Sequence, residues 1–246
     1  MCPPRQGSPT DPRAGVPAAP VPLKRLLAAA QAGVQLAPRP KHPRSDPEAV
    51  ALFKASWRER LDEIARQHPQ KRLRVYFQDE SRFGQQGTLT RRWAKTGSRP
   101  TAVRQTEYQY LWVTASVCPE TGHAEGLLSP KMNTATINRF LALFSASIPA
   151  GEHAVMVWDG AGFHTSKSLR MPENITPVRL PPYSPELNPI ENLWHYLKSH
   201  FWSNRSYQGA EDLEKAALAA WQAAVLDESL MKTVCSAPYA KRATSD

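Results

Sequence analysis

Three acidic residues stand where carboxylates could act together on one substrate. Asp79 and Asp159 each end an apolar, β-rich run, Leu73–Asp79 and Ala154–Asp159, and a loop sequence follows each. If the two strands are neighbours, both carboxylates leave the sheet at one edge, where ligands bind in open α/β sheets. Adjacent carboxylates repel unless a cation lies between them, and hard oxygen ligands favour Mg²⁺ or Mn²⁺ over zinc. For either aspartate alone, the alternative is that it caps the following turn.

Glu191 is the third candidate and has two interpretations. It follows Asn188 and Pro189, which suit the N-cap and the first position of a helix, so Glu191 is expected as the third helical residue. From the first turn its carboxylate could reach over the sheet edge toward the two aspartates. An N-cap followed three residues later by glutamate is also a capping box, in which Glu191 would be purely structural.

Hydrophobic periodicity predicts the elements that must position these acids. Successive strands, followed by strands that alternate with helices, predict an α/β fold with a mixed sheet and helices on its faces. We expect helices over 21–34, 46–68, 134–148, 189–202 and 210–226, and strands over 73–79, 87–94, 108–118, 125–128, 154–159 and 176–180.

Proline and charge separate the N-terminal part of the chain from the rest. Residues 1–47 contain 11 of the 23 prolines, and residues 1–74 hold 14 Lys and Arg against 6 Asp and Glu, which accounts for +8 of the net charge of +9. This predicts a basic, Pro-rich, disordered arm over 1–45, a catalytic domain over 46–230 and a tail over 231–246. Such an arm suits a polyanion such as nucleic acid, although a merely solvated basic tail would have the same charge.

Composition excludes several classes of protein. The chain has no run of eighteen apolar residues and no apolar signal sequence, so we expect no membrane partner and a cytoplasmic location. Cys2, Cys118 and Cys235 lie far apart without a zinc-binding spacing, and we interpret them as free thiols.

Four segments in order resemble one family. They are Phe77–Gly84, Arg92–Ala94 with Gly97–Pro100, Val157–His164, and Leu180–Trp194 with its Pro-Pro-Tyr-Ser-Pro-Glu-Leu-Asn-Pro-Ile-Glu motif. Together they resemble the mariner-like bacterial transposases of the insertion sequence 630 group, from about residue 38 to residue 221. The resemblance implies an RNase-H-like fold in which Asp79, Asp159 and Glu191 are the catalytic acids and bind two Mg²⁺ or Mn²⁺ ions.

The same resemblance implies a reaction and its partners. Such an enzyme cleaves DNA at the transposon ends and joins the 3′-OH to target DNA, with TA as the target dinucleotide. It is expected to act as a homodimer on DNA, at the nucleoid of a bacterial cell. Basic residues that could contact phosphates are Arg39, Lys41, Arg44, Arg91, Arg92, Lys131 and Lys167, and for Arg91, Arg92, Lys131 and Lys167 the alternative is solvated surface charge.

The sequence departs from the family at its start. Transposases of this group begin with paired helix-turn-helix modules, which some 45 Pro-rich residues cannot contain. The chain is therefore expected to be the catalytic part of a split element, with a separate helix-turn-helix polypeptide, or a decayed copy. A catalytically idle DNA-binding remnant and an RNase-H-like nuclease without strand transfer are the alternatives.

Overall fold

A computed structural model describes residues 43–87, 95–98 and 105–240 of the chain. Its strands form one sheet in the order β3-β2-β1-β4-β5. The β1/β2 and β2/β3 pairs are antiparallel, whereas β1/β4 and β4/β5 are parallel, so the expected mixed sheet is confirmed. The strands are β1 (Arg72–Gly84), β2 (Tyr110–Val117), β3 (Ala124–Ser129), β4 (Glu152–Trp158) and β5 (Ile175–Arg179).

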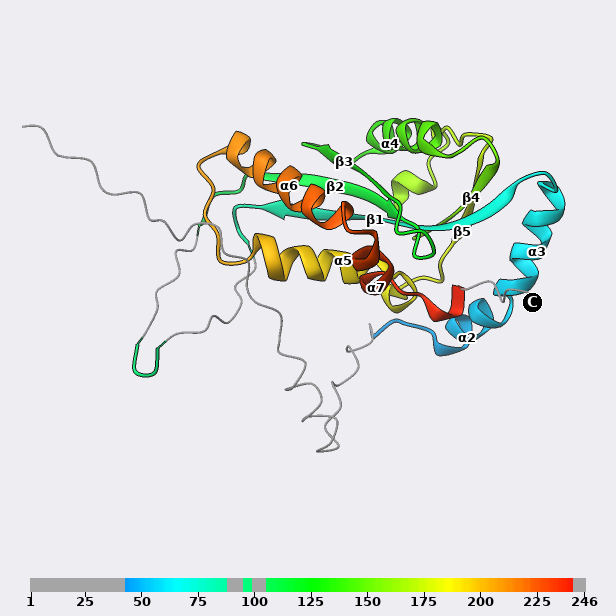
Figure 1. Cartoon of the computed structure of the whole chain (residues 1–246), viewed down its shortest axis with the longest axis horizontal. Helices are drawn as coiled ribbons and strands as arrows, with labels where there is room; N and C mark the ends of the chain where they lie inside the picture. Colours follow the sequence, from blue (N-terminus) through cyan, green and yellow to red (C-terminus); the bar gives the residue numbers. More distant parts are fainter. Residues whose placement is uncertain (1–42, 88–94, 99–104, 241–246) are drawn as a thin grey trace, which may run out of the picture. The chain divides into compact units, whose positions relative to one another are not determined.

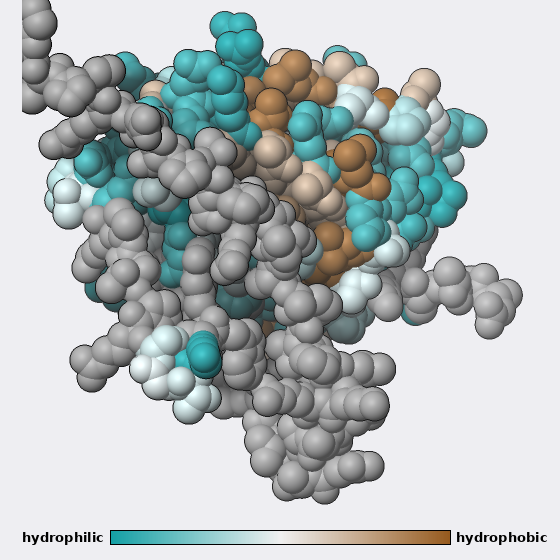
Figure 2. All heavy atoms as spheres, turned by 60° about the vertical axis from the view of Figure 1, so that its left-hand side comes forward, coloured by the Kyte–Doolittle hydropathy of each residue, from teal (hydrophilic) through white to brown (hydrophobic). Residues whose placement is uncertain are grey.

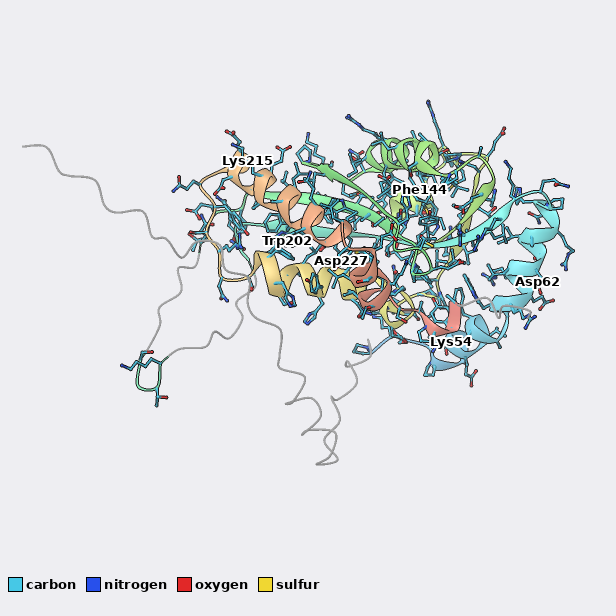
Figure 3. All side chains as sticks on the ribbon, viewed as in Figure 1. Lys54, Asp62, Phe144, Trp202, Lys215 and Asp227 are labelled. Atoms are coloured by element: carbon cyan, nitrogen blue, oxygen red, sulfur yellow. The ribbon has the colours of Figure 1, made fainter. Side chains whose placement is uncertain are left out.

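Helices cover both faces of this sheet (Figure 1). α4 (Thr134–Ser147) lies on one face, and α5 (Ile190–Leu197) and α6 (Ala210–Val225) lie on the other. Successive side chains of a strand point to opposite faces, so Met156 packs with α4 while Val157 packs with α5 and α6. Figure 3 shows the same division, with Phe144 of α4 and Trp202 in separate core layers.

The helix expected over 46–68 is two helices. α2 (Pro47–Ala55) and α3 (Trp57–Gln67) are separated at Ser56, which has a ψ near zero. Asp46 caps α2 as expected, because its side chain accepts from the N–H groups of Glu48 and Ala49. Each helix buries an aromatic side chain next to the break at Ser56, Phe53 in α2 and Trp57 in α3.

The C-terminal boundary at residue 230 is wrong. α7 (Glu228–Val234) and the 3₁₀ turn η4 (Pro238–Ala240) belong to the folded domain. Met231 and Cys235 are fully buried in the main core, and Tyr239 packs on the rings of Phe53 and Trp57. The chain beyond α6 therefore completes the core instead of leaving it as a tail.

Two other elements differ in extent. β1 continues five residues past Asp79, to Gly84, because it stays paired with β2 after its pairing with β4 has ended. The helix expected to run to residue 202 is α-helical only to Leu197 and continues as a π-helical turn, η3 (Lys198–Trp202). That turn brings Trp202 onto Phe83, with ring centroids 4.4 Å apart.

Several expectations lie outside the described residues, namely those on residues 1–42, including the arm and the helix over 21–34, and on 88–94 and 241–246. Cys2 is among them, while Cys118 and Cys235 are buried free thiols. In the described part of the chain, every helix is too short or too polar to cross a bilayer. Figure 2 shows a surface on which hydrophilic residues surround smaller groups of apolar ones.

Candidate active site

The parallel register of β1 and β4 brings the two aspartates together. Phe77 pairs with Val157, and the same register continued by two residues places Asp79 opposite Asp159. Asp159 follows β4 directly, as expected, but Asp79 lies within β1, at the point where that strand loses its parallel neighbour. The sequence predicted that both strands end beside these aspartates, but only β4 ends there, while β1 continues past Asp79.

Glu191 is the second residue of α5 and not the third, because Pro189 instead of Asn188 is the N-cap, and the capping box is not formed. In a capping box, the glutamate carboxylate would accept from the backbone N–H of Asn188. That N–H donates instead to the carbonyl of Pro185 at 3.0 Å, and the Asn188 side-chain amide donates to the carbonyl of Gln78 at 3.0 Å. Asn188 thus fastens the start of α5 to β1 and leaves the Glu191 carboxylate to another role.

One cavity of about 450 Å³ is lined by all three acids. Asp79 enters from β1, Asp159 from the end of β4 and Glu191 from α5. Arg179, the last residue of β5, and Tyr183, which has a left-handed backbone φ of 56°, also line it. The remaining lining residues are Gly160, Ala161, Leu180, Pro181, Pro182, Ser184, Pro185 and Asn188.

Asp79 is the most electrostatically perturbed of the three acids. Burial raises the pKa of its carboxyl, the negative charges of Glu191 and Glu80 raise it further, and the result is about 8. A hydrogen bond of 2.8 Å from Trp194 Nε1 to Asp79 Oδ2 opposes this shift by stabilising the carboxylate. Asp79 therefore lies among negative charges that the surrounding protein only partly offsets.

Asp159 is held by a buried histidine. The Nδ1 atom of His164 lies 2.9 Å from Asp159 Oδ1, and its Nε2 atom lies 3.1 Å from Glu80 Oε1. The hydrogen bond with His164 lowers the pKa of Asp159. Burial lowers the pKa of His164, but its hydrogen bonds to Asp159 and Glu80 prevail and raise it to about 9, so the ring is an imidazolium at neutral pH.

The donor set suits a hard divalent cation. Three carboxylates share one cavity, and the pKa of Asp79 is raised first by burial and then by the negative charges of Glu191 and Glu80. Mg²⁺ and Mn²⁺ prefer such oxygen ligands. Among the described residues, however, no three His, Cys, Asp or Glu side chains form a ready-made ligand group. Trp194 and His164 each occupy one oxygen of an aspartate, so ion binding would use other oxygens or small side-chain movements.

The Lys and Arg residues proposed from the sequence as phosphate contacts lie in different places relative to the cavity. Arg44 Nη1 donates to Tyr183 Oη at 3.1 Å, which places Arg44 beside a residue of the cavity. Lys131 and Lys167 are exposed and do not belong to the described lining. Arg39, Lys41, Arg91 and Arg92 lie outside the described residues.

Sequence reasoning missed four residues of this site: Glu80, Arg179 and the direct partners Trp194 and His164. From the sequence, Trp194 is most simply a core aromatic and His164 a structural loop residue. Both are indeed buried, but each also contacts a catalytic candidate. The sequence signal for Trp194 was its place three residues after Glu191 in the same helix.

Comparison with solved structures supports this fold. The Mos1 transposase paired-end complex with the left transposon end is 16% identical, with a TM-score of 0.56 over 86% of this chain and 66% of that chain. The Mos1 mariner paired-end complex with Mn is also 16% identical, with a TM-score of 0.55 over 92% of this chain and 78% of that chain. At such identity the likeness establishes the RNase-H-like fold, and this chain spans about two thirds of the first structure's chain.

Sequence comparison establishes the family. The uncharacterized protein y4pE/y4sA of Sinorhizobium fredii (strain NBRC 101917 / NGR234) is 38% identical over 112 residues, which are 46% of this chain and 83% of that protein. The family model described as "DDE superfamily endonuclease" matches residues 74–214, more than half of the chain and a range that contains all three acids. The chain therefore belongs to the DDE superfamily endonuclease family.

Proposed function

We propose that this chain is the catalytic domain of a DNA transposase of the mariner-like bacterial insertion sequence 630 group. It would cut the phosphodiester at each transposon end and join the resulting 3′-OH to target DNA at TA. The observation that carries this proposal is the meeting of Asp79, Asp159 and Glu191 in one cavity. The family and the Mos1-like fold agree with it.

Each side chain of the cavity has a proposed role. Asp79, Asp159 and Glu191 would hold two Mg²⁺ or Mn²⁺ ions. Such ions supply an activated nucleophile and stabilise the charge that develops on the phosphate and the leaving oxygen. Arg179 brings a positive charge to a cavity otherwise dominated by carboxylates, so it is suited to contact a non-bridging phosphate oxygen. Trp194 and His164 hold the two aspartates.

The partners follow from the same proposal. The chain would act as a homodimer on DNA in the bacterial cytoplasm, at the nucleoid, with a separate helix-turn-helix polypeptide recognising the transposon ends. The basic arm would add sequence-independent phosphate contacts.

Two assays with the full chain test this function. In Mn²⁺, the wild-type chain should nick supercoiled plasmid, and Asp159→Asn, which keeps the shape of the side chain and removes its charge, should lower the rate by orders of magnitude. A pre-cut oligonucleotide with a free 3′-OH should then become joined to plasmid. Nicking without joining would indicate a nuclease, and a chain inactive in both assays would indicate an idle remnant.

A further inference from the structure

His164 connects the interior of the domain to the cavity. The side chains of His164 and Glu80 are 0% and 5% exposed, whereas that of Asp159 is 56% exposed. The imidazole lies between the two carboxylates, 2.9 Å from Asp159 and 3.1 Å from Glu80. The described lining of the cavity includes Asp159 but neither His164 nor Glu80. A buried pair therefore holds a carboxylate that faces solvent.

The imidazole is fixed by contacts that do not involve Asp159. Its ring stacks on Trp158 with centroids 4.3 Å apart and meets the ring of Phe163 edge-on at 4.7 Å. Glu80 is itself held, because Gln78 Nε2 donates to its Oε1 at 2.7 Å. The ring can therefore serve as a rigid reference point for a neighbouring side chain.

Asp159 needs such a reference point more than Asp79 or Glu191 does. Asp79 lies within a paired strand and Glu191 within a helix, whereas Asp159 lies in the loop after β4. Its Oδ1 accepts from His164 and from the backbone N–H of Ala161 at 2.9 Å. The turn to Ala161 is local to the loop, so the hydrogen bond to His164 is the one that ties the carboxylate to the rigid interior.

We propose that Glu80 and His164 are positioning residues, which hold the Asp159 carboxylate in the orientation that binds a divalent ion. This inference rests on the proposed function, because it assumes that Asp159 is a metal ligand. Partners that orient a metal ligand through hydrogen bonds typically change metal affinity roughly ten- to a hundredfold when they are removed. His164 and Glu80 act through Asp159 and do not contact the DNA.

Calorimetric titration of the full chain with Mn²⁺ tests this role. His164→Gln and Glu80→Gln should each weaken Mn²⁺ binding by roughly ten- to a hundredfold. The double variant should be little weaker than either single variant, because both substitutions break the same bridge. Glu80→Gln keeps the size of the side chain and remains informative if His164→Gln does not fold.

The second buried histidine of the domain is the matched control. His153 lies in β4, 2% exposed, with its Nε2 atom 2.8 Å from Thr176 Oγ1 and its ring stacked on His68. His153→Gln should lower stability and leave Mn²⁺ affinity unchanged. Folded His164 and Glu80 variants that bind Mn²⁺ as the wild type does would overturn the inference alone. A wild-type chain that takes up no Mn²⁺ would overturn the proposed function and this inference with it.

Discussion

The indole Nε1 of Trp194 donates a hydrogen bond of 2.8 Å to Oδ2 of Asp79. Trp194 lies one helical turn after Glu191, so α5 carries both a candidate ligand and the donor that fixes the opposite one. The indole also belongs to the buried apolar face that packs α5 on the sheet. The packing of α5 on the sheet therefore also positions two of the three acids, Asp79 and Glu191.

Trp194→Phe should weaken Mn²⁺ binding severalfold, because the Asp79 carboxylate loses the hydrogen bond that favours its charged form. Removing part of a buried aromatic ring should also lower the free energy of unfolding by about 1–3 kcal/mol. Trp202→Phe is the control, since its buried Nε1 has no hydrogen-bond partner in the described part of the chain. Calorimetry and denaturant titration should show lower stability in both variants and weaker Mn²⁺ binding only in Trp194→Phe. Equal losses of Mn²⁺ affinity would contradict this role of Trp194.

The pKa of Asp79, raised to about 8 from 3.8, predicts how the metal-free protein responds to pH. Between these values the native state binds a proton that the unfolded state has released, so this stabilising contribution is complete below about pH 4 and is lost as pH rises through 8. Asp79→Asn should remove this part of the pH dependence. Urea denaturation in a chelator, from about pH 5 to about pH 9, measures the difference between the two chains. Parallel curves for the wild type and the variant would refute the assignment.

Glu191→Gln should abolish DNA cleavage, because a metal ligand needs the negative charge. The melting temperature without metal should be unchanged or higher, because the Glu191 carboxylate repels Asp79 and makes no capping box. Glu191→Asp should retain part of the activity, since a shorter carboxylate still offers a charged oxygen. Glu186→Gln, four residues from the start of α5 and outside the described cavity lining, should be fully active. Nicking assays and thermal melts of the three variants test this, and an active Glu191→Gln chain would exclude a ligand role.

The lowered pKa of His153 predicts that the protein loses stability in acid. Burial and the nearby positive groups His68 and Lys71 lower its pKa from 6.5 to about 4, so the native state resists the proton that the unfolded chain takes up. Its contribution to stability is present above about pH 6.5 and is lost as pH falls through 4. His153→Gln should reduce the slope of stability against pH in this window. The comparison of wild type and variant by denaturant titration isolates this histidine from carboxylates that titrate nearby.

Removal of residues 1–42 should weaken DNA binding and make its salt dependence less steep. The deletion removes six Lys and Arg and one Asp, and each lost phosphate contact makes the negative slope of log K against log salt shallower by roughly 0.9. Residues 43–46 should be kept, because Arg44 contacts Tyr183 and Asp46 caps α2. Lys215→Gln with Lys232→Gln removes two positive charges from α6 and α7 and should change the slope far less than the deletion does. Fluorescence anisotropy at several salt concentrations gives the slopes, and an unchanged slope in the truncated chain would refute a role for the arm.

The sequence by itself determined which strands and helices carry the candidate site and which acids belong to it. The apolar runs before Asp79 and Asp159 predicted buried strands, and Pro189 with the hydrophobic periodicity over 189–202 predicted the helix that carries Glu191. These features are local, because side-chain period and helix caps depend on neighbours within one or two turns. For the same reason the sequence predicted the type of each of these elements better than its ends.

Tertiary structure alone decided which groups surround the acids. The strand β1 passes Asp79 because β2 continues to pair with it, and Glu80 lies beside His164, 84 residues away, only because β1 and β4 are adjacent. The side chain of Asn188 accepts from the N–H of Ile190 at the start of α5 and also donates to the carbonyl of Gln78, which is 110 residues away. Hydrogen bonds between distant segments are set by the order and register of the sheet, which no local pattern encodes. The acids could therefore be named from the sequence, while Trp194, His164 and Glu80 became functional candidates only when the sheet was assembled.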